Sequence, residues 1–278
     1  MKKINRRSFL AAAGLTAAAL ALTACGGSAS STASSTASSA ASSEAASTSA
    51  AAELTTVEAG KLTMATNAAF PPYEMTTDAG EFEGIDIDTA KAIADKLGLE
   101  LQIDDMDFDA ALLSVQQGKA DIVMAGVTVT DERKAVMDFS DSYATGIQSI
   151  IVPEGSDITS PDDLAGKKIG TQRGTTGYIY CSDDFGDDAV VAYDDGLTAV
   201  QALNNGQVDA VVIDNAPAKE FVAANPGLVI LDTSYAEEDY AIGLAKGSAL
   251  EDAVNAALEE LKADGTLQSI VDKYITAE

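Results

Sequence analysis

The sequence of 278 residues contains no histidine, no tryptophan and only two cysteines. Without histidine the chain has no imidazole to serve as a general base, as part of a nucleophilic triad or as a metal ligand. Catalysis by histidine and metal binding by histidine are therefore excluded. If Cys25 carries lipid, Cys181 has no cysteine left to pair with, and the fold is not held by a disulfide. Cys181 is therefore expected to be a small packed residue rather than a reactive thiol.

Positive charge is also scarce. The chain has 17 lysines and arginines against 44 aspartates and glutamates, and its formal net charge is -27 at pH 7. A surface with this excess of negative charge repels nucleic acid and anionic lipid headgroups. We therefore expect no nucleic-acid partner.

The first 53 residues have the composition of an export signal and a tether. A basic start is followed by a short apolar run, Phe9 to Ala24, below the ~20 residues of a membrane span, which predicts a signal peptide over residues 1–24. The run ends in a segment that is similar to a lipoprotein cleavage box, so Cys25 is predicted to carry lipid and to begin the mature chain. The alternative is an ordinary signal peptide with a chance cysteine. Residues 25–53 are mostly Ser, Ala and Thr and are predicted to form a disordered tether.

These segments predict a protein held by lipid at the outer face of the cell membrane, without crossing it. The pair Arg6-Arg7 leaves both the Sec and the twin-arginine export routes open. The folded part is expected to begin near Leu54. It has about 225 residues, enough for one large domain or for two lobes.

The stretch from Ala120 to Tyr143 has the pattern of a strand, a small-residue turn and a helix start. Ile122 to Met124 is apolar, as in a buried strand, and Thr130 is a candidate helix N-cap followed by two acidic residues. The planar guanidinium of Arg133, the hydroxyl of Thr128 and free backbone N–H groups make a candidate carboxylate site. The alternative is that Arg133 is one solvated helix charge among many.

One helix–strand pattern occurs twice, about 88 residues apart. Leu112–Val123 and Val200–Val211 both have the pattern of an amphipathic helix, a glycine stop, an aspartate and a buried strand. Under this offset Gly126 corresponds to Asp214, and both follow strands at the edge where α/β proteins bind ligands. A carboxylate-binding edge opposite a carboxylate predicts a site for a zwitterion such as a free amino acid. The alternative is that Asp214 only caps the next helix.

Other segments predict supporting structure. The acids between Asp104 and Asp109 lack the glycine and the closing glutamate of an EF-hand loop, so we interpret them as helix caps. Gln172 to Gly177 is either a plain strand–helix turn or a helix N-terminus open to an anion. Helices are expected over 88–97, 110–117, from a capping box at Ser248 to Gly265, and over 267–275.

Several motifs, in order, resemble the polar amino-acid-binding proteins of ABC importers, which are extracellular solute-binding proteins of family 3. They are FPPYE at 70–74, GIDID at 84–88, GKADIVMAGVTVTDER at 118–133, DFSDSY at 138–143, GTTG at 174–177 and GQVDAVVIDN at 206–215. The resemblance covers residues 62–275 and implies an α/β, two-lobed periplasmic-binding-protein type II fold. Each lobe is expected to be a mixed sheet flanked by helices, with two hinge crossings near 145–149 and 237–241. Lobe 1 is expected to comprise 54–146 and 240–278, and lobe 2 residues 147–239.

The resemblance also implies ligand contacts by position. Arg133 is expected to clamp the ligand α-carboxylate, helped by Thr128 and by the backbone N–H groups of Thr128 and Thr176. Asp214 is expected to hold the α-ammonium group, with the carbonyl of Gly126 assisting. These contacts place one charge from each half of the chain on a small dipolar ligand.

The remaining implied contacts concern the ligand side chain. Phe70 and Phe108 are expected to sandwich its carbon chain, and Asn67, Ala125 and Gln172 to line its pocket. Relatives that take cationic or amide ligands often have Asp where this chain has Asn67. The loss of that carboxylate predicts a neutral polar ligand, such as glutamine or cystine, rather than a basic one.

The function predicted from these patterns is capture of a free amino acid and delivery to a membrane-bound ABC permease and its ATPase. We expect a monomer, with no cofactor and no catalysis. One alternative is a dehydratase or lyase on the same scaffold, whose general acid has to be a buried carboxylate. Another is an amino-acid sensor lipoprotein that feeds no transporter.

Overall fold

The computed structural model describes residues 54–275. The predicted signal peptide 1–24, the lipidation site Cys25 and the tether 25–53 lie outside the described residues. Within 54–275, none of the helices combines the length and the apolar character that crossing a membrane requires.

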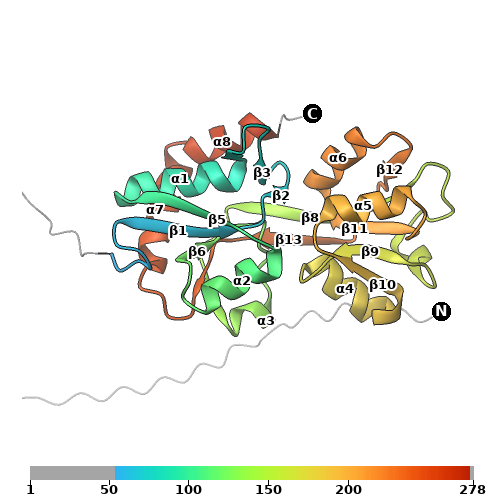
Figure 1. Ribbon diagram of the computed structural model, residues 1–278, viewed down its shortest axis with the longest axis horizontal. Coiled ribbons are helices and arrows are strands. Elements are labelled where there is room, and N and C mark those ends of the chain that lie inside the picture. Colours follow the sequence, from blue (N-terminus) through green and yellow to red (C-terminus); the bar gives the residue numbers. More distant parts are fainter. Residues whose placement is uncertain (1–53, 276–278) are drawn as a thin grey trace, which may run out of the picture. The chain divides into compact units, whose positions relative to one another are not determined.

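The first sheet has five strands in the order β5-β1-β6-β14-β7. Strands β5, β1 and β6 are parallel, whereas β14 is antiparallel to both of its neighbours. Helices α1, α7 and α8 pack together on one face, and α2 and α3 lie on the other (Figure 1). We call this sheet with its helices lobe 1. Its elements are β1 (Lys61–Thr66), α1 (Ile85–Leu97), β5 (Glu100–Asp105), α2 (Phe108–Gln116), β6 (Ile122–Val123), α3 (Asp131–Lys134), β7 (Met137–Phe139), β14 (Gly243–Ala245), α7 (Glu251–Ala263) and α8 (Thr266–Tyr274).

Alternation along β1 explains why this sheet is covered on both faces. Leu62 and Met64 belong to the core that contains α1 and α7, whereas Ala65 belongs to the core under α2. Successive strand side chains point to opposite faces, so an apolar run on one strand supplies two cores. A small three-stranded sheet follows β1 and consists of β2 (Ala69–Phe70), β3 (Glu74–Thr76) and β4 (Phe82–Glu83).

The second sheet has the order β10-β9-β11-β8-β12, and β13 also pairs with β8. Helices α5 and α6 cover one face and α4 the other (Figure 1), and every residue of the central strand β11 is buried. We call this sheet with its helices lobe 2. Its elements are β8 (Ala144–Pro153), η1 (Pro161–Leu164), β9 (Ile169–Gln172), α4 (Thr176–Phe185), η2 (Asp187–Ala189), β10 (Val190–Tyr193), α5 (Gly196–Asn204), β11 (Ala210–Asp214), α6 (Asn215–Ala224), β12 (Leu228–Ile230) and β13 (Ala236–Tyr240).

Two strands connect the lobes. The chain leaves lobe 1 through β7, enters lobe 2 along β8, and returns along β13 to β14. Strands β8 and β13 pair antiparallel, with Tyr240 opposite Ala144. The predicted α/β fold with two sheets and two crossings is confirmed. The division of the chain at 146/147 and 239/240 stays a prediction.

The repeated unit of the sequence is also found in the structure, as α2–β6 in lobe 1 and α5–β11 in lobe 2. The aspartate of the repeat does the same work in both: Asp121 Oδ2 accepts from the Thr63 amide and Asp209 Oδ2 from the Lys168 amide, each at 2.8 Å. In both lobes the carboxylate ties the turn before the repeat strand to the neighbouring strand.

Two of the expected helix starts are wrong by three residues, and the helix expected from 110 begins at Phe108. Helix α1 begins at Ile85, three residues before the expected start, because Gly84 adopts φ 133 and turns the chain directly into the helix. The expected capping box at Ser248 does not form. Helix α7 begins at Glu251, and the Ser248 hydroxyl accepts from the Leu250 amide at 3.2 Å in the turn before the helix.

Candidate functional site

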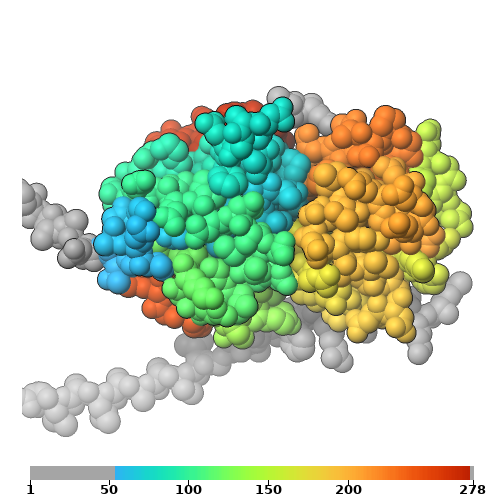
Figure 2. Space-filling model, in the orientation of Figure 1, coloured from blue at the N-terminus to red at the C-terminus, as the bar shows by residue number. Residues whose placement is uncertain are grey.

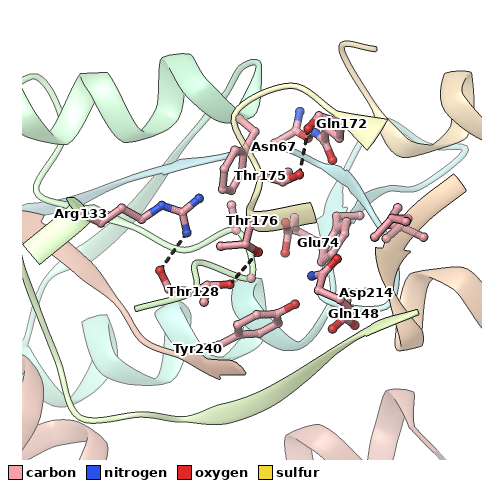
Figure 3. A pocket seen from close by; sticks show the side chains of 16 residues that line it. Asn67, Glu74, Thr128, Arg133, Gln148, Gln172, Thr175, Thr176, Asp214 and Tyr240 are labelled. Carbon is pink, nitrogen blue, oxygen red and sulfur yellow. Dashed lines mark hydrogen bonds between the residues drawn. The ribbon is translucent and has the colours of Figure 1, made fainter. Parts of the chain in front are cut away.

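The residues predicted from the sequence as ligand contacts line one cavity. It lies where strand ends of both sheets meet, and Figure 3 shows Arg133 and Asp214 at opposite ends of it. Its volume is about 30 Å³, room for one or two water molecules. All ten predicted ligand contacts line it: Asn67, Phe70, Phe108, Ala125, Gly126, Thr128, Arg133, Gln172, Thr176 and Asp214. Their role in binding stays a prediction.

Arg133 is held in place by backbone carbonyls from both lobes. Its own amide donates to Thr130, which caps the short helix α3, so the side chain leaves the helix at a fixed point. Nη1 donates to the Thr128 carbonyl at 2.8 Å and Nη2 to the Gly174 carbonyl of lobe 2 at 3.1 Å. The guanidinium lies 5.4 Å from the ring centre of Phe108. The side chain is therefore a buried, oriented cation rather than a solvated helix charge.

Asp214 both caps a helix and faces the cavity. Its Oδ1 accepts from the Ala216 amide at 3.0 Å at the start of α6, and its Oδ2 accepts from the Ile147 amide at 2.7 Å. Burial raises the pKa of Asp214 to about 6, although these two hydrogen bonds and one from Tyr240 oppose the shift. The capping role and the cavity position, which the sequence left as alternatives, occur together.

Amide side chains join the lobes at another part of the cavity wall. Gln172 Nε2 donates to Asn67 Oδ1 at 2.8 Å and also approaches the Asp194 carbonyl at 3.2 Å. Asn67 Nδ2 donates to the Met106 carbonyl at 2.9 Å. Both amides are buried. This part of the wall offers amide dipoles and no fixed charge.

Hydroxyl groups join the lobes beside Arg133. Thr128 Oγ1 lies 3.4 Å from Thr176 Oγ1 across the cavity (Figure 3) and donates to Glu238 Oε2 at 3.0 Å. Gln148 Nε2 donates to the same Glu238 oxygen at 3.0 Å. Glu238 is buried on the returning strand β13, and no local sequence pattern pointed to it as a site residue.

A pair of buried carboxyl groups, also missed from the sequence, lies behind the cavity. Burial raises the pKa of Glu74 well above its ordinary value, and the nearby Asp86 raises it further. Burial also raises the pKa of Asp86 to about 6, while its hydrogen bond from the Gly126 amide at 3.0 Å opposes this. Both acids stand inside motifs noted in the sequence, FPPYE and GIDID, but nothing local shows that they meet. Glu74 therefore lines the cavity as a carboxyl group whose charged form is disfavoured by burial.

The remaining lining residues are Gln148, Thr175, Val212, Ile213 and Tyr240. Tyr240 forms an isolated bridge with Thr128 and packs edge-on against Tyr73 at 5.4 Å between ring centres. From the sequence, residues 237–241 were predicted only to form a lobe crossing. Within residues 54–275 no group of acidic or cysteine side chains is arranged to hold a metal ion, and Asp105 instead accepts from the Ala68 amide at 2.8 Å.

Known proteins share the sequence pattern and the fold of this chain. Residues 62–277 match the model of the family described as bacterial extracellular solute-binding proteins, family 3. A probable histidine-binding protein of Neisseria gonorrhoeae is 32% identical over 99% of this chain and 98% of its own length. The L-cystine-binding protein of Escherichia coli K12 is 33% identical over 80% of this chain and 85% of its own length.

Solved structures show the same fold. An ancestral arginine-binding protein bound to glutamine is 43% identical and superposes with a TM-score of 0.75, covering 78% of this chain and 99% of that chain. The arginine-, lysine- and histidine-binding protein of Geobacillus stearothermophilus is 34% identical with a TM-score of 0.75, over 78% of this chain and 96% of that chain. The fold is thus the two-lobed type II fold of periplasmic binding proteins, and the chain belongs to the bacterial extracellular solute-binding proteins of family 3.

Proposed function

We propose that this protein is an extracytoplasmic lipoprotein that captures a free, neutral polar amino acid between its lobes and delivers it to an ABC permease. The observation that carries the proposal is the pair Arg133 and Asp214. Both are buried, each comes from a different lobe, and both line one cavity. A zwitterion has the complementary charges, so its carboxylate is assigned to Arg133 and its ammonium group to Asp214.

Arg133 keeps hydrogen-bonding capacity for a ligand. A guanidinium has five N–H donors, and two contacts to backbone carbonyls are present. The remaining donors, together with the hydroxyls of Thr128 and Thr176, suit a carboxylate with several lone pairs. At the other end, the two oxygens of Asp214 each accept one backbone N–H and retain lone pairs for an ammonium group.

The choice of a neutral side chain rests on Asn67 and Gln172. Their amides offer a carbonyl and N–H groups, which pair with a terminal amide or another uncharged polar group. Glu74 is the other carboxyl group in the lining, and burial and the nearby Asp86 raise its pKa, which makes it a poorer partner for a cationic side chain. Solved ancestral relatives carry glutamine in one structure and arginine in another, which supports an amino-acid ligand without choosing its charge.

Ligand entry requires the lobes to separate. A cavity of about 30 Å³ is far smaller than the roughly 300 Å³ or more of typical ligand sites. The direct contacts Gln172–Asn67, Thr128–Thr176 and Arg133–Gly174 span the cavity, and Figure 2 shows the surfaces of residues 54–275 meeting on the viewed face. We propose that an amino acid exchanges its own contacts for these, with β8 and β13 flexing as the hinge.

The test is calorimetric titration of the mature protein with a panel of free L-amino acids that includes cystine. Calorimetry is chosen because the chain has no tryptophan as a fluorescent reporter. We expect tight binding of a neutral polar member and weak or no binding of arginine and lysine. Tight binding of only basic members contradicts the neutral assignment, and no binding at all contradicts the capture function.

Two rival functions are separated by further measurements. An enzyme on this scaffold forms product from a cyclic carboxylate substrate, so incubation followed by mass spectrometry distinguishes it from a binding protein. A sensor lipoprotein binds the same ligand without feeding a transporter, so uptake of the labelled amino acid survives deletion of its gene. We expect no product and a loss of uptake.

A further inference from the structure

Glu238 places a second carboxylate beside the position proposed for the ligand carboxylate. It lies on β13, is 6% exposed and takes no part in the cavity lining. Burial lowers the pKa of Arg133, and the negative charge of Glu238 is the strongest influence that raises it again. The carboxylate of Glu238 therefore already offsets part of the positive charge of Arg133, which a ligand carboxylate also needs.

The hydroxyl of Thr128 has a single proton, and it donates that proton in a hydrogen bond to Glu238. Thr128 Oγ1 donates to Glu238 Oε2 at 3.0 Å, because a carboxylate only accepts. In the 3.4 Å contact between the two threonine hydroxyls, Thr176 is consequently the donor. A ligand carboxylate also has only acceptors, so it competes with Glu238 for the Thr128 proton.

We propose that Glu238 is a positioning residue that limits the affinity of the site, by holding the Thr128 hydroxyl proton and by placing a like charge near the ligand carboxylate. The inference rests on the proposed function, because it takes that carboxylate to lie at Arg133 and Thr128. A purely structural role for Glu238, in which it only anchors Thr128 and Gln148, predicts the opposite sign: loss of its charge weakens the site or leaves it unchanged.

The experiment compares Glu238→Gln and Glu238→Met with the wild-type mature protein by calorimetry, using each L-amino acid of the panel as the probe. Both variants remove the negative charge at nearly constant volume. We expect binding about tenfold tighter for any probe that the wild type binds, since charges a few ångströms apart in a partly buried site interact by more than a factor of ten in affinity. Glu237→Gln is the matched control, because Glu237 is the exposed neighbour on the same strand; its affinity is expected to stay within about twofold.

A double-mutant comparison tests the shared proton. When Thr128→Val is added to Glu238→Met, which leaves the hydroxyl without an oxygen acceptor at position 238, we expect the part of the gain that comes from the freed hydroxyl to disappear. Circular dichroism melting of every variant monitors folding.

The outcomes separate the two proposals. Weaker or unchanged ligand binding in both Glu238 variants overturns this inference. A failure of both variants to fold also overturns it. In either case, Arg133→Ala still tests the proposed function on its own. If Arg133→Ala leaves affinity unchanged, or if the wild type binds no member of the panel, the proposed function fails and this inference fails with it.

Discussion

The two lobes begin from the same α/β unit and diverge where its strand ends. In lobe 2, β11 ends at Asp214 and α6 starts at the next residue, so the strand's last side chain is also the helix cap. In lobe 1, β6 ends at Val123, and the chain passes through Gly126 at φ 55 before α3 begins at Asp131. An added Cβ at Gly126 would lie 2.9 Å from the Phe70 ring, so the loop depends on glycine.

The divergence explains why the charges differ. The residue of lobe 2 that corresponds to Arg133 under the repeat offset is Phe221, which is buried in the apolar core of that lobe. The longer loop of lobe 1 instead carries position 133 to the cavity, where it meets the Gly174 carbonyl. The comparison teaches that one scaffold edge supplies a cation or an anion according to the path of the chain just after the strand.

The largest effect is expected from removing the lobe 1 cation. Arg133→Ala should weaken amino-acid binding by about a hundredfold, because it removes charge-assisted hydrogen bonds worth roughly 1.5–3 kcal/mol each. Arg173→Ala is the matched control, since Arg173 belongs to the same loop as Gly174 but is exposed. Calorimetry measures both, and equal affinities in the two variants would show that the cavity cation does not bind ligand.

Removing the negative charge of Asp214 in lobe 2 should weaken amino-acid binding somewhat less than removing Arg133. Asp214→Asn keeps an oxygen for the Ala216 amide but removes the charge and the acceptor for the Ile147 amide, so we expect at least about a tenfold loss of affinity and a smaller fall in melting temperature than in Asp214→Ala. Asp214→Ala should lose the same affinity and also stability, because it uncaps α6. Asp195→Ala, which uncaps α5 away from the cavity lining, should lose stability alone. Unchanged affinity in Asp214→Asn would reduce Asp214 to a helix cap.

A substitution at position 67 tests the part of the cavity wall that is proposed to face the ligand side chain. Asn67→Asp should raise affinity for arginine or lysine by about tenfold and lower it for the neutral ligand, because a carboxylate replaces an amide at a buried wall. The panel titration measures the ratio between basic and neutral probes. A ratio that stays constant would mean that the ligand side chain points elsewhere.

The smallest expected effect is the response to pH. Since burial raises the pKa of Asp214 to about 6, acidification from pH 7 to 5 protonates it and should weaken binding severalfold. Stability should move in the other direction: the folded-state pKa values of Asp214 and Asp86 lie above the ordinary 3.8, so their contribution to stability falls as pH rises toward 6. Calorimetry and melting over this range check both signs. Asp214→Asn should flatten the binding profile, and an unaltered profile in that variant would assign the titration to another group.

Local sequence determined a large part of this protein. Strand alternation, the repeated helix–glycine–aspartate–strand unit and the Thr130 cap predicted elements close to those observed, and Arg133 and Asp214 stood out because they follow buried strands. Helix boundaries failed where a glycine conformation or a turn hydroxyl decided them, as at Gly84 and Ser248. Those features depend on a backbone φ angle at Gly84 and on which nearby amide the Ser248 hydroxyl binds, and the apolar pattern reports neither.

Tertiary structure alone decided which buried acids surround the cavity. Glu238 meets Thr128 across 110 residues of chain, and the Gly126 amide meets Asp86 across 40. Short-range periodicity reports which face of an element is apolar, but it carries no information about which distant element packs against that face. The charge pair was therefore visible in the sequence, whereas the carboxyl groups that set its electrostatics required the folded chain.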